Sequence, residues 1–185
     1  MTLKSLINEI HQKWDTVMDP TANPQEWDRE LQTEFVGYPV YNWTDDFNYS
    51  KCHTYEILLH KGIFYNPGSL AGEERLIRQV GGQKYSILLK LSVVLPYYWS
   101  QVLCRELDNN GQVSEQAIEP ETPLHVQMLQ RAQQFAEYHS FKQLPRNYLS
   151  QLVPDIKLEL AETGTVTVYN CLFEDQDNYI APPIF

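Results

Sequence analysis

The sequence lacks a long apolar run. No stretch approaches the roughly 18 apolar residues that a membrane-spanning helix requires. The first ten residues carry Lys4 and Glu9 in an amphipathic pattern, without the apolar core and small-residue cleavage site of a signal peptide. We therefore expect a protein that has no membrane partner and stays in the cytoplasm.

Cysteine is scarce, and Cys52, Cys104 and Cys171 lie far apart. They form no Cys-x-x-Cys pair and no Cys/His cluster with zinc spacing. Cys104 and Cys171 occupy apolar, strand-like runs and are expected in the core, whereas Cys52 is expected at the edge of a loop. The odd number fits a reducing compartment, and one disulfide with a leftover thiol is the alternative.

The common catalytic signatures are also absent. The chain has no G-x-x-x-x-G-K-[ST], G-x-G-x-x-G, H-E-x-x-H or G-x-S-x-G motif. Cys52 and His53 are adjacent, so on an extended chain they point to opposite sides. We expect no catalytic residue, no metal and no cofactor. The alternative is an enzyme whose site assembles from distant residues such as Cys52, His53, His60 and Asp45.

Basic residues are few relative to acidic ones. The 185 residues include 14 Lys and Arg against 24 Asp and Glu, which gives a net charge of −10. This balance argues against a nucleic-acid backbone or an anionic membrane as the main partner. With 43% apolar and 21% charged residues, the chain is typical of a folded globular protein.

The charges are unevenly distributed along the chain. Acids dominate residues 14–50, 106–125 and 158–185, where the only base is Arg29, while residues 51–105 contain seven bases and three acids. Two interpretations fit this distribution. The acids can simply solvate helix faces, or they can form an acidic face that docks a basic partner such as a nuclease.

Hydrophobic periodicity predicts an α+β fold in one domain, residues 1–185. Apolar residues recur at helical spacing in two N-terminal segments and in a later pair, and alternate in several strand-like runs. We expect a mainly antiparallel sheet of about five to six strands with these helices packed on it. The expected helices span residues 3–18, 24–36, 73–80, 126–139 and 145–153, and the expected strands span residues 55–60, 85–95, 97–107, 112–118, 157–160 and 165–173.

The strand-like runs also suggest their places in the sheet. Residues 85–95 are partly apolar on both alternating faces, which is typical of a central strand. Asp108-Asn109-Asn110-Gly111 is a strong hairpin turn. The polar run that follows it, residues 112–118, is expected at an edge of the sheet.

An aromatic segment supplies the best candidates for a binding surface. Residues 38–53 have no clean period, and we expect an ordered loop with one short strand. Its rings lie beside acids, which suits an epitope for a basic protein better than a stacking platform for nucleic-acid bases. The candidate partner-binding residues are Tyr41, Trp43, Asp45 and Asp46 in this segment, with Glu106, Asp108 and Glu115 near the predicted hairpin.

Three segments carry a family resemblance: residues 87–99 (ILLKLSVVLPYYW), 153–156 (VPDI) and 166–175 (VTVYNCLFED). They resemble parts of small bacterial α+β proteins, some of them similar to immunity proteins encoded beside polymorphic or contact-dependent toxins. The resemblance implies a cytoplasmic protein that neutralises a toxin by occlusion, without catalysis of its own. We therefore expect an acidic protein-binding module with a basic partner such as a toxin domain. An enzyme, or a structural or regulatory subunit of a complex, is the alternative.

Overall fold

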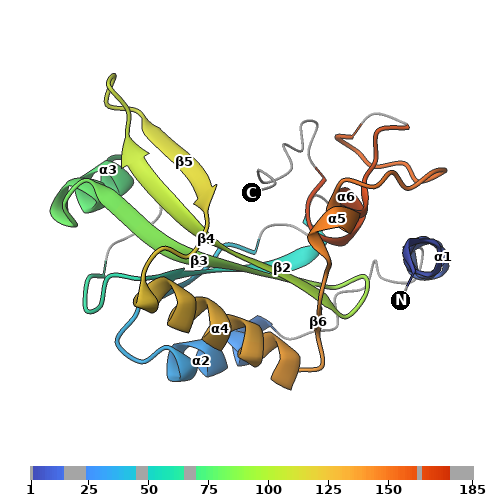
Figure 1. Ribbon diagram of the computed structural model, residues 1–185, viewed down its shortest axis with the longest axis horizontal. Helices are drawn as coiled ribbons and strands as arrows, with labels where there is room; N and C mark the ends of the chain where they lie inside the picture. Colours follow the sequence, from blue (N-terminus) through green and yellow to red (C-terminus); the bar gives the residue numbers. More distant parts are fainter. Residues whose placement is uncertain (1, 15–23, 45–49, 65–69, 162–163, 176–185) are drawn as a thin grey trace.

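The computed structural model describes residues 2–14, 24–44, 50–64, 70–161 and 164–175 (Figure 1). It confirms the α+β fold, with a six-stranded, mainly antiparallel sheet. The helices are α1 (Leu3–Trp14), α2 (Pro24–Glu34), α3 (Leu70–Gln79), α4 (Pro123–Tyr138), α5 (Arg146–Leu149) and α6 (Val168–Leu172). The strands are β1 (Val40–Asn42), β2 (Cys52–Leu58), β3 (Gln83–Ser92), β4 (Tyr97–Leu107), β5 (Val113–Ile118) and β6 (Lys142–Gln143).

Five strands lie in chain order, β1-β2-β3-β4-β5, and every neighbouring pair is antiparallel. The two-residue strand β6 pairs in parallel with the start of β4. The predictions that β3 is central and β5 is at an edge are confirmed. The predicted hairpin turn is also present, because the Asp108 N–H donates to the Gln112 carbonyl at 2.8 Å. Gly111 has φ +77°, a conformation that side chains with a Cβ rarely adopt.

One face of the sheet is apolar and is covered by α2 and α4, which lie below it in Figure 1. Strand register places the odd-numbered residues of β2 and β3 on this face. It buries Tyr55, Ile57 and Leu89 against Phe35, the residue after α2, and Met128 of α4. Burial of this apolar layer stabilises the sheet against α2 and α4.

The other face of the sheet, here called the polar face, carries Thr54, Glu56, Lys84, Lys90 and Arg105 in the same register. In Figure 1, α3 lies above one end of it and the segment containing α5 and α6 lies above the other. That segment forms a second apolar cluster with α1. Within the described parts of the chain, each helix is too short or too polar to cross a bilayer.

The predicted strand at residues 165–173 is wrong. The structure has a short helix there, α6. The β-branched residues in VTVY suggested a strand, but Thr167 and Asn170 form a capping box that starts a helix instead. The predicted last hairpin is also absent, because residues 157–160 form no strand and Thr167 makes an isolated bridge with Leu152 instead.

The expectation that Cys52 lies at the edge of a loop is also wrong. Cys52 is the first residue of β2 and is completely buried. The predicted short strand in its segment is confirmed as β1, which pairs with β2. Residues 15–18 of the first predicted helix lie outside the described residues.

Leu89 provides a test of the central strand. It is 0% exposed in the apolar layer beneath α4, so Leu89→Ala should lower the free energy of unfolding by roughly 2–5 kcal/mol. The control Leu152→Ala removes an exposed side chain and should change it by less than about 0.5 kcal/mol. Denaturant unfolding measures both values, and equal values for the two variants would contradict this packing.

Candidate functional site

The centre of the polar face is the buried carboxylate of Glu56, whose side chain is 1% exposed. Its Oε2 accepts the indole N–H of Trp43 at 2.9 Å. Its Oε1 accepts Nη1 of Arg105 at 2.6 Å and lies 2.9 Å from Nζ of Lys84. Three donors from different parts of the sheet therefore converge on one carboxylate.

The charges extend outward from this centre. Lys84 also binds Glu73 of α3 at 2.7 Å, and Nε of Arg105 donates to Glu115 of β5 at 2.5 Å. The resulting chain of contacts crosses the whole polar face from the residue after β1 to β5. We call it the Glu56 network, and its members are Trp43, Glu56, Glu73, Lys84, Arg105 and Glu115.

Mutual neutralisation keeps these buried groups charged. Burial alone would raise the pKa of Glu56, but the charges of Arg105 and Lys84 outweigh it, and the pKa lies below its usual range. The pKa of Arg105 is raised for the reciprocal reason, since Glu56 and Glu115 outweigh the effect of burial. Glu56 and Arg105 are therefore both charged at neutral pH.

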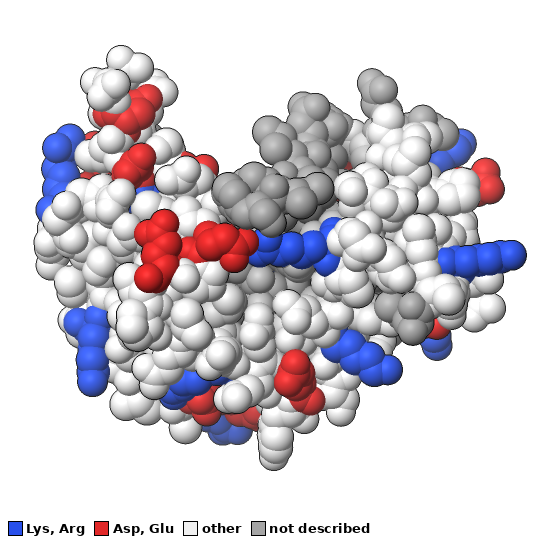
Figure 2. Space-filling view, viewed as in Figure 1, with Lys and Arg blue, Asp and Glu red and all other residues white. Residues whose placement is uncertain are grey.

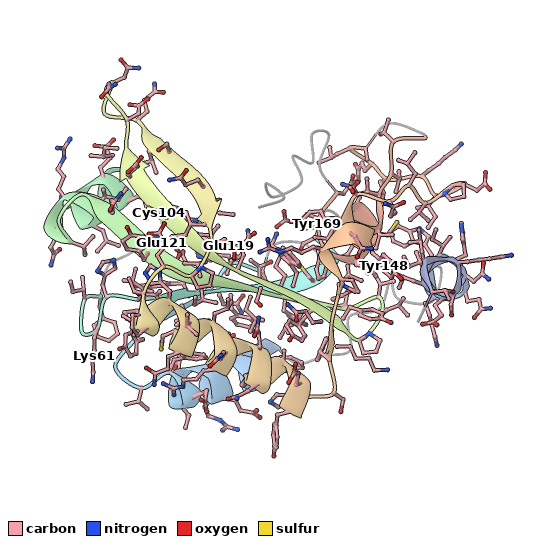
Figure 3. The ribbon with its side chains drawn as sticks, viewed as in Figure 1. Lys61, Cys104, Glu119, Glu121, Tyr148 and Tyr169 are labelled. Carbon is pink, nitrogen blue, oxygen red and sulfur yellow. The ribbon has the colours of Figure 1, made fainter. Side chains whose placement is uncertain are left out.

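A second cluster joins the C-terminal segment to the polar face. Nζ of Lys90 donates to the hydroxyl of Tyr169 at 2.9 Å and contacts the carboxylate of Glu174. The Tyr169 hydroxyl in turn donates to Glu174 at 3.2 Å. Figure 3 shows Tyr169 reaching from α6 toward the middle of the sheet. Lys90 therefore anchors the segment that covers this end of the face.

The structure brings three of the predicted partner-binding residues onto the polar face. Tyr41 pairs with Glu56 across β1 and β2. Trp43 and Glu115 belong to the Glu56 network, although they lie beside opposite edges of the sheet. Trp43 is 41% exposed and the Glu115 side chain is 47% exposed, so both remain accessible.

The remaining predicted residues are placed differently. Glu106 faces away from the polar face and accepts a hydrogen bond from Gln83 at 3.1 Å. Asp108 shapes the hairpin turn, where its Oδ1 accepts the N–H groups of Asn110 and Gln112, each at 2.8 Å. Asp45 and Asp46 lie outside the described residues.

The histidines and cysteine of the alternative enzyme site do not converge. Cys52 and His53 point to opposite faces of β2, and burial raises the pKa of the Cys52 thiol. His53 stacks on Trp27 at 5.9 Å between ring centroids. His60 accepts the backbone N–H of Tyr85 at 3.1 Å. Among the residues that the structure describes, no three His, Cys, Asp or Glu side chains are grouped to hold a metal ion.

Sequence reasoning missed Glu56, Lys84 and Lys90. A signal was present, because each is a charged residue inside a strand that otherwise reads as apolar. Even numbers also place Lys84 and Lys90 on one face of β3. The strand register was needed to show that these opposite charges share one face, because residue numbers alone do not relate two strands.

Comparisons with known proteins add no assignment. A scan against protein-family models, a search of curated proteins and a search of solved structures each returned no match. The functional interpretation therefore depends on the site itself.

Breaking the Glu56 network should destabilise the fold. Glu56→Gln leaves Lys84 and Arg105 buried with less compensating charge and should cost about 2–4 kcal/mol at pH 7. Glu119→Gln is the matched control, since Glu119 forms only an exposed ion pair with Arg146 and should matter little.

The pH dependence gives an independent check of the same variant. A folded-state pKa below the unfolded value means that Glu56 stabilises the fold above its ordinary pKa of 4.5, and that this contribution is lost as the pH falls. Urea unfolding between pH 7 and pH 3 should show a shallower acid slope for Glu56→Gln than for the wild type. Parallel slopes would contradict the role of Glu56.

Burial of the three free thiols predicts their reactivity. Cys52, Cys104 and Cys171 are all buried, and burial raises each thiol pKa, that of Cys171 to about 12. A chromogenic thiol reagent at pH 8 should label none of them within the time that denatured protein needs for complete reaction. Rapid labelling of native Cys52 would show that β2 does not bury it.

Proposed function

We propose that the chain is an acidic protein-binding module that neutralises a basic toxin domain by occluding it, with no catalytic step of its own. The observation that carries this proposal is the fixed, exposed ring of Trp43. Its N–H donates to the carboxylate of Glu56, which in turn is held by the buried Lys84 and the half-buried Arg105. A ring ordered in advance loses little conformational entropy on binding, which suits a hot spot.

The charge around the β4–β5 hairpin supports a basic partner. Acidic side chains gather on the hairpin and below its base in Figure 2, and Figure 3 labels Glu119 and Glu121 at that base. Two of the nearby cations are already paired, Arg105 with Glu56 and Glu115, and Arg146 with Glu119. The acids of this region are Glu106, Asp108, Glu115, Glu119 and Glu121.

The proposed mechanism has two parts, electrostatic attraction of the partner and retention of the complex by Trp43. A negative field raises the association rate of a positively charged partner. A toxin that acts on nucleic acid would present a basic groove, and carboxylates docked there would take the place of phosphates. Trp43 would then hold the complex by filling an apolar pocket beside that groove.

The two rival functions have less support. The described residues of the enzyme alternative lie apart, with Cys52 and His53 on opposite faces of β2. A permanent subunit would expose a large continuous apolar patch. The most exposed large apolar side chains instead come from separate elements, namely Val36 after α2, Phe64 after β2 and Tyr138 at the end of α4.

Coexpression with the product of the adjacent gene tests the proposal. If that product is the toxin, it should arrest growth alone, and the wild-type chain should restore growth. A chain that fails to bind the product, or to restore growth, would contradict the function proposed here.

Binding kinetics should separate the two parts of the mechanism. Trp43→Ala should weaken binding by about 2 kcal/mol or more, mainly because the complex dissociates faster. The double variant Asp45→Asn with Asp46→Asn should instead slow association, and added salt should weaken the wild type more than this variant. Surface-binding measurements at two salt concentrations give both quantities.

Two controls accompany these variants. Trp43→Phe keeps an aromatic ring but loses the hydrogen bond to Glu56, so it shows how much the fixed orientation contributes. Thermal unfolding of each variant confirms that the fold persists. Identical rates and salt slopes for wild type and the Asn double variant would remove Asp45 and Asp46 from the interface.

A further inference from the structure

The outer edge of β5 is an open edge of the sheet. β5 is the last strand in the order, and among the described residues nothing pairs with its outer side. Three consecutive residues in the strand, Ser114, Glu115 and Gln116, are exposed. Its tip, formed with β4, stands away from the body of the protein in Figure 1. Backbone groups on such an edge are free to pair with another strand.

The register identifies the groups that face outward. Asp108 and Gln112 form a hydrogen-bonded pair at the turn, and such pairs alternate along an antiparallel ladder. Ser114, Gln116 and Ile118 therefore point their backbone groups at β4. Val113, Glu115 and Ala117 point theirs outward, with their side chains on the polar face.

The charge on this edge selects between possible occupants. A second copy paired symmetrically about Glu115 would set the two Glu115 carboxylates opposite each other, which is unfavourable. Asp108 precedes the strand at the turn, Glu119 and Glu121 follow it, and no Lys or Arg occurs between residues 106 and 130. An extended segment rich in Lys or Arg would instead bring positive charges next to these acids, and this attraction favours binding.

We propose that β5 binds an extended basic segment of a partner protein as an additional strand of the sheet. The inference rests on the proposed function and names how the partner docks. Backbone hydrogen bonds to Val113, Glu115 and Ala117 supply the pairing. Because strand side chains alternate between faces, basic side chains at alternate positions of the segment lie beside Glu115.

Peptide selection on the full chain tests the inference. A display library of random eight-residue peptides is selected against wild type, and the strongest binders are measured against Ala117→Pro and Ala117→Val. Proline removes an outward N–H without breaking the ladder to β4, a position that edge strands tolerate. Valine changes only the side chain and is the matched control.

The expected peptides alternate Lys or Arg with β-branched residues. They should bind Ala117→Pro at least tenfold more weakly than wild type, and Ala117→Val within twofold. If Ala117→Pro does not fold, hydrogen exchange on wild type decides: the bound peptide should protect the amides of Val113, Glu115 and Ala117. Peptides without basic enrichment, equal binding to the proline variant, or unprotected amides would each overturn strand addition.

Two further outcomes keep this inference separate from the proposed function. If the toxin binds the Ala117→Pro variant as tightly as wild type but no longer binds the Trp43→Ala variant, strand addition is overturned and the proposed function stands. If sedimentation shows a dimer that Ala117→Pro abolishes, the edge pairs with a second copy, and a basic partner segment is excluded.

Discussion

The sharing of one buried carboxylate among three donors constrains this sheet more than any other contact. Trp43, Lys84 and Arg105 reach Glu56 from beside β1, from β3 and from β4. Buried ion pairs often add little net stability, but removing one partner leaves the others desolvated and unpaired. The network therefore penalises any arrangement of these strands except the native one, and it fixes the orientation of the Trp43 ring.

The burial of cations explains why the sequence suggests a different surface from the one observed. Residues 51–105 carry an excess of bases, yet Lys84 and Lys90 are buried and Arg105 is largely covered. Their charges are neutralised inside the polar face, by Glu56 and Glu73 in one cluster and by Glu174 in the other. Among the acids near the hairpin, Glu115 pairs with Arg105 and Glu119 pairs with Arg146. Glu106, Asp108 and Glu121 form no ion pair with the described residues, so they contribute most to the field outside.

Much of the sheet could be predicted from sequence because local patterns specify it. Alternation across residues 85–95 identified the central strand, and Asp108 to Gly111 identified the turn. The C-terminal helix α6 could not be found this way, since β-branched residues and a capping box give opposing local signals and packing decides between them. The burial of Cys52 was missed because the C-terminal segment covers it: its thiol donates to the Phe173 carbonyl at 3.3 Å, a contact between residues far apart in the sequence.

The candidate site shows the limit of the same reasoning. Sequence placed Trp43 and Glu115 in separate acidic epitopes, and only the fold shows that Glu56 and Arg105 connect them. Asp108 had the right charge and exposure for a binding residue, but its carboxylate is already engaged by the turn. Composition identifies candidate residues, whereas tertiary contacts decide which of them act together.

The separation of the charged side chains of β3 from its apolar odd-numbered residues has a consequence for the gene. A codon inserted in the middle of β3 shifts every later residue of the strand to the opposite face. Lys90 would then enter the apolar layer beneath α4, while Leu89 and Leu91 would face the ionic one. At the hairpin tip, residues 109–111, the same insertion only lengthens a surface turn. Natural length variation should therefore concentrate at this tip and avoid the strands, even where substitutions are tolerated.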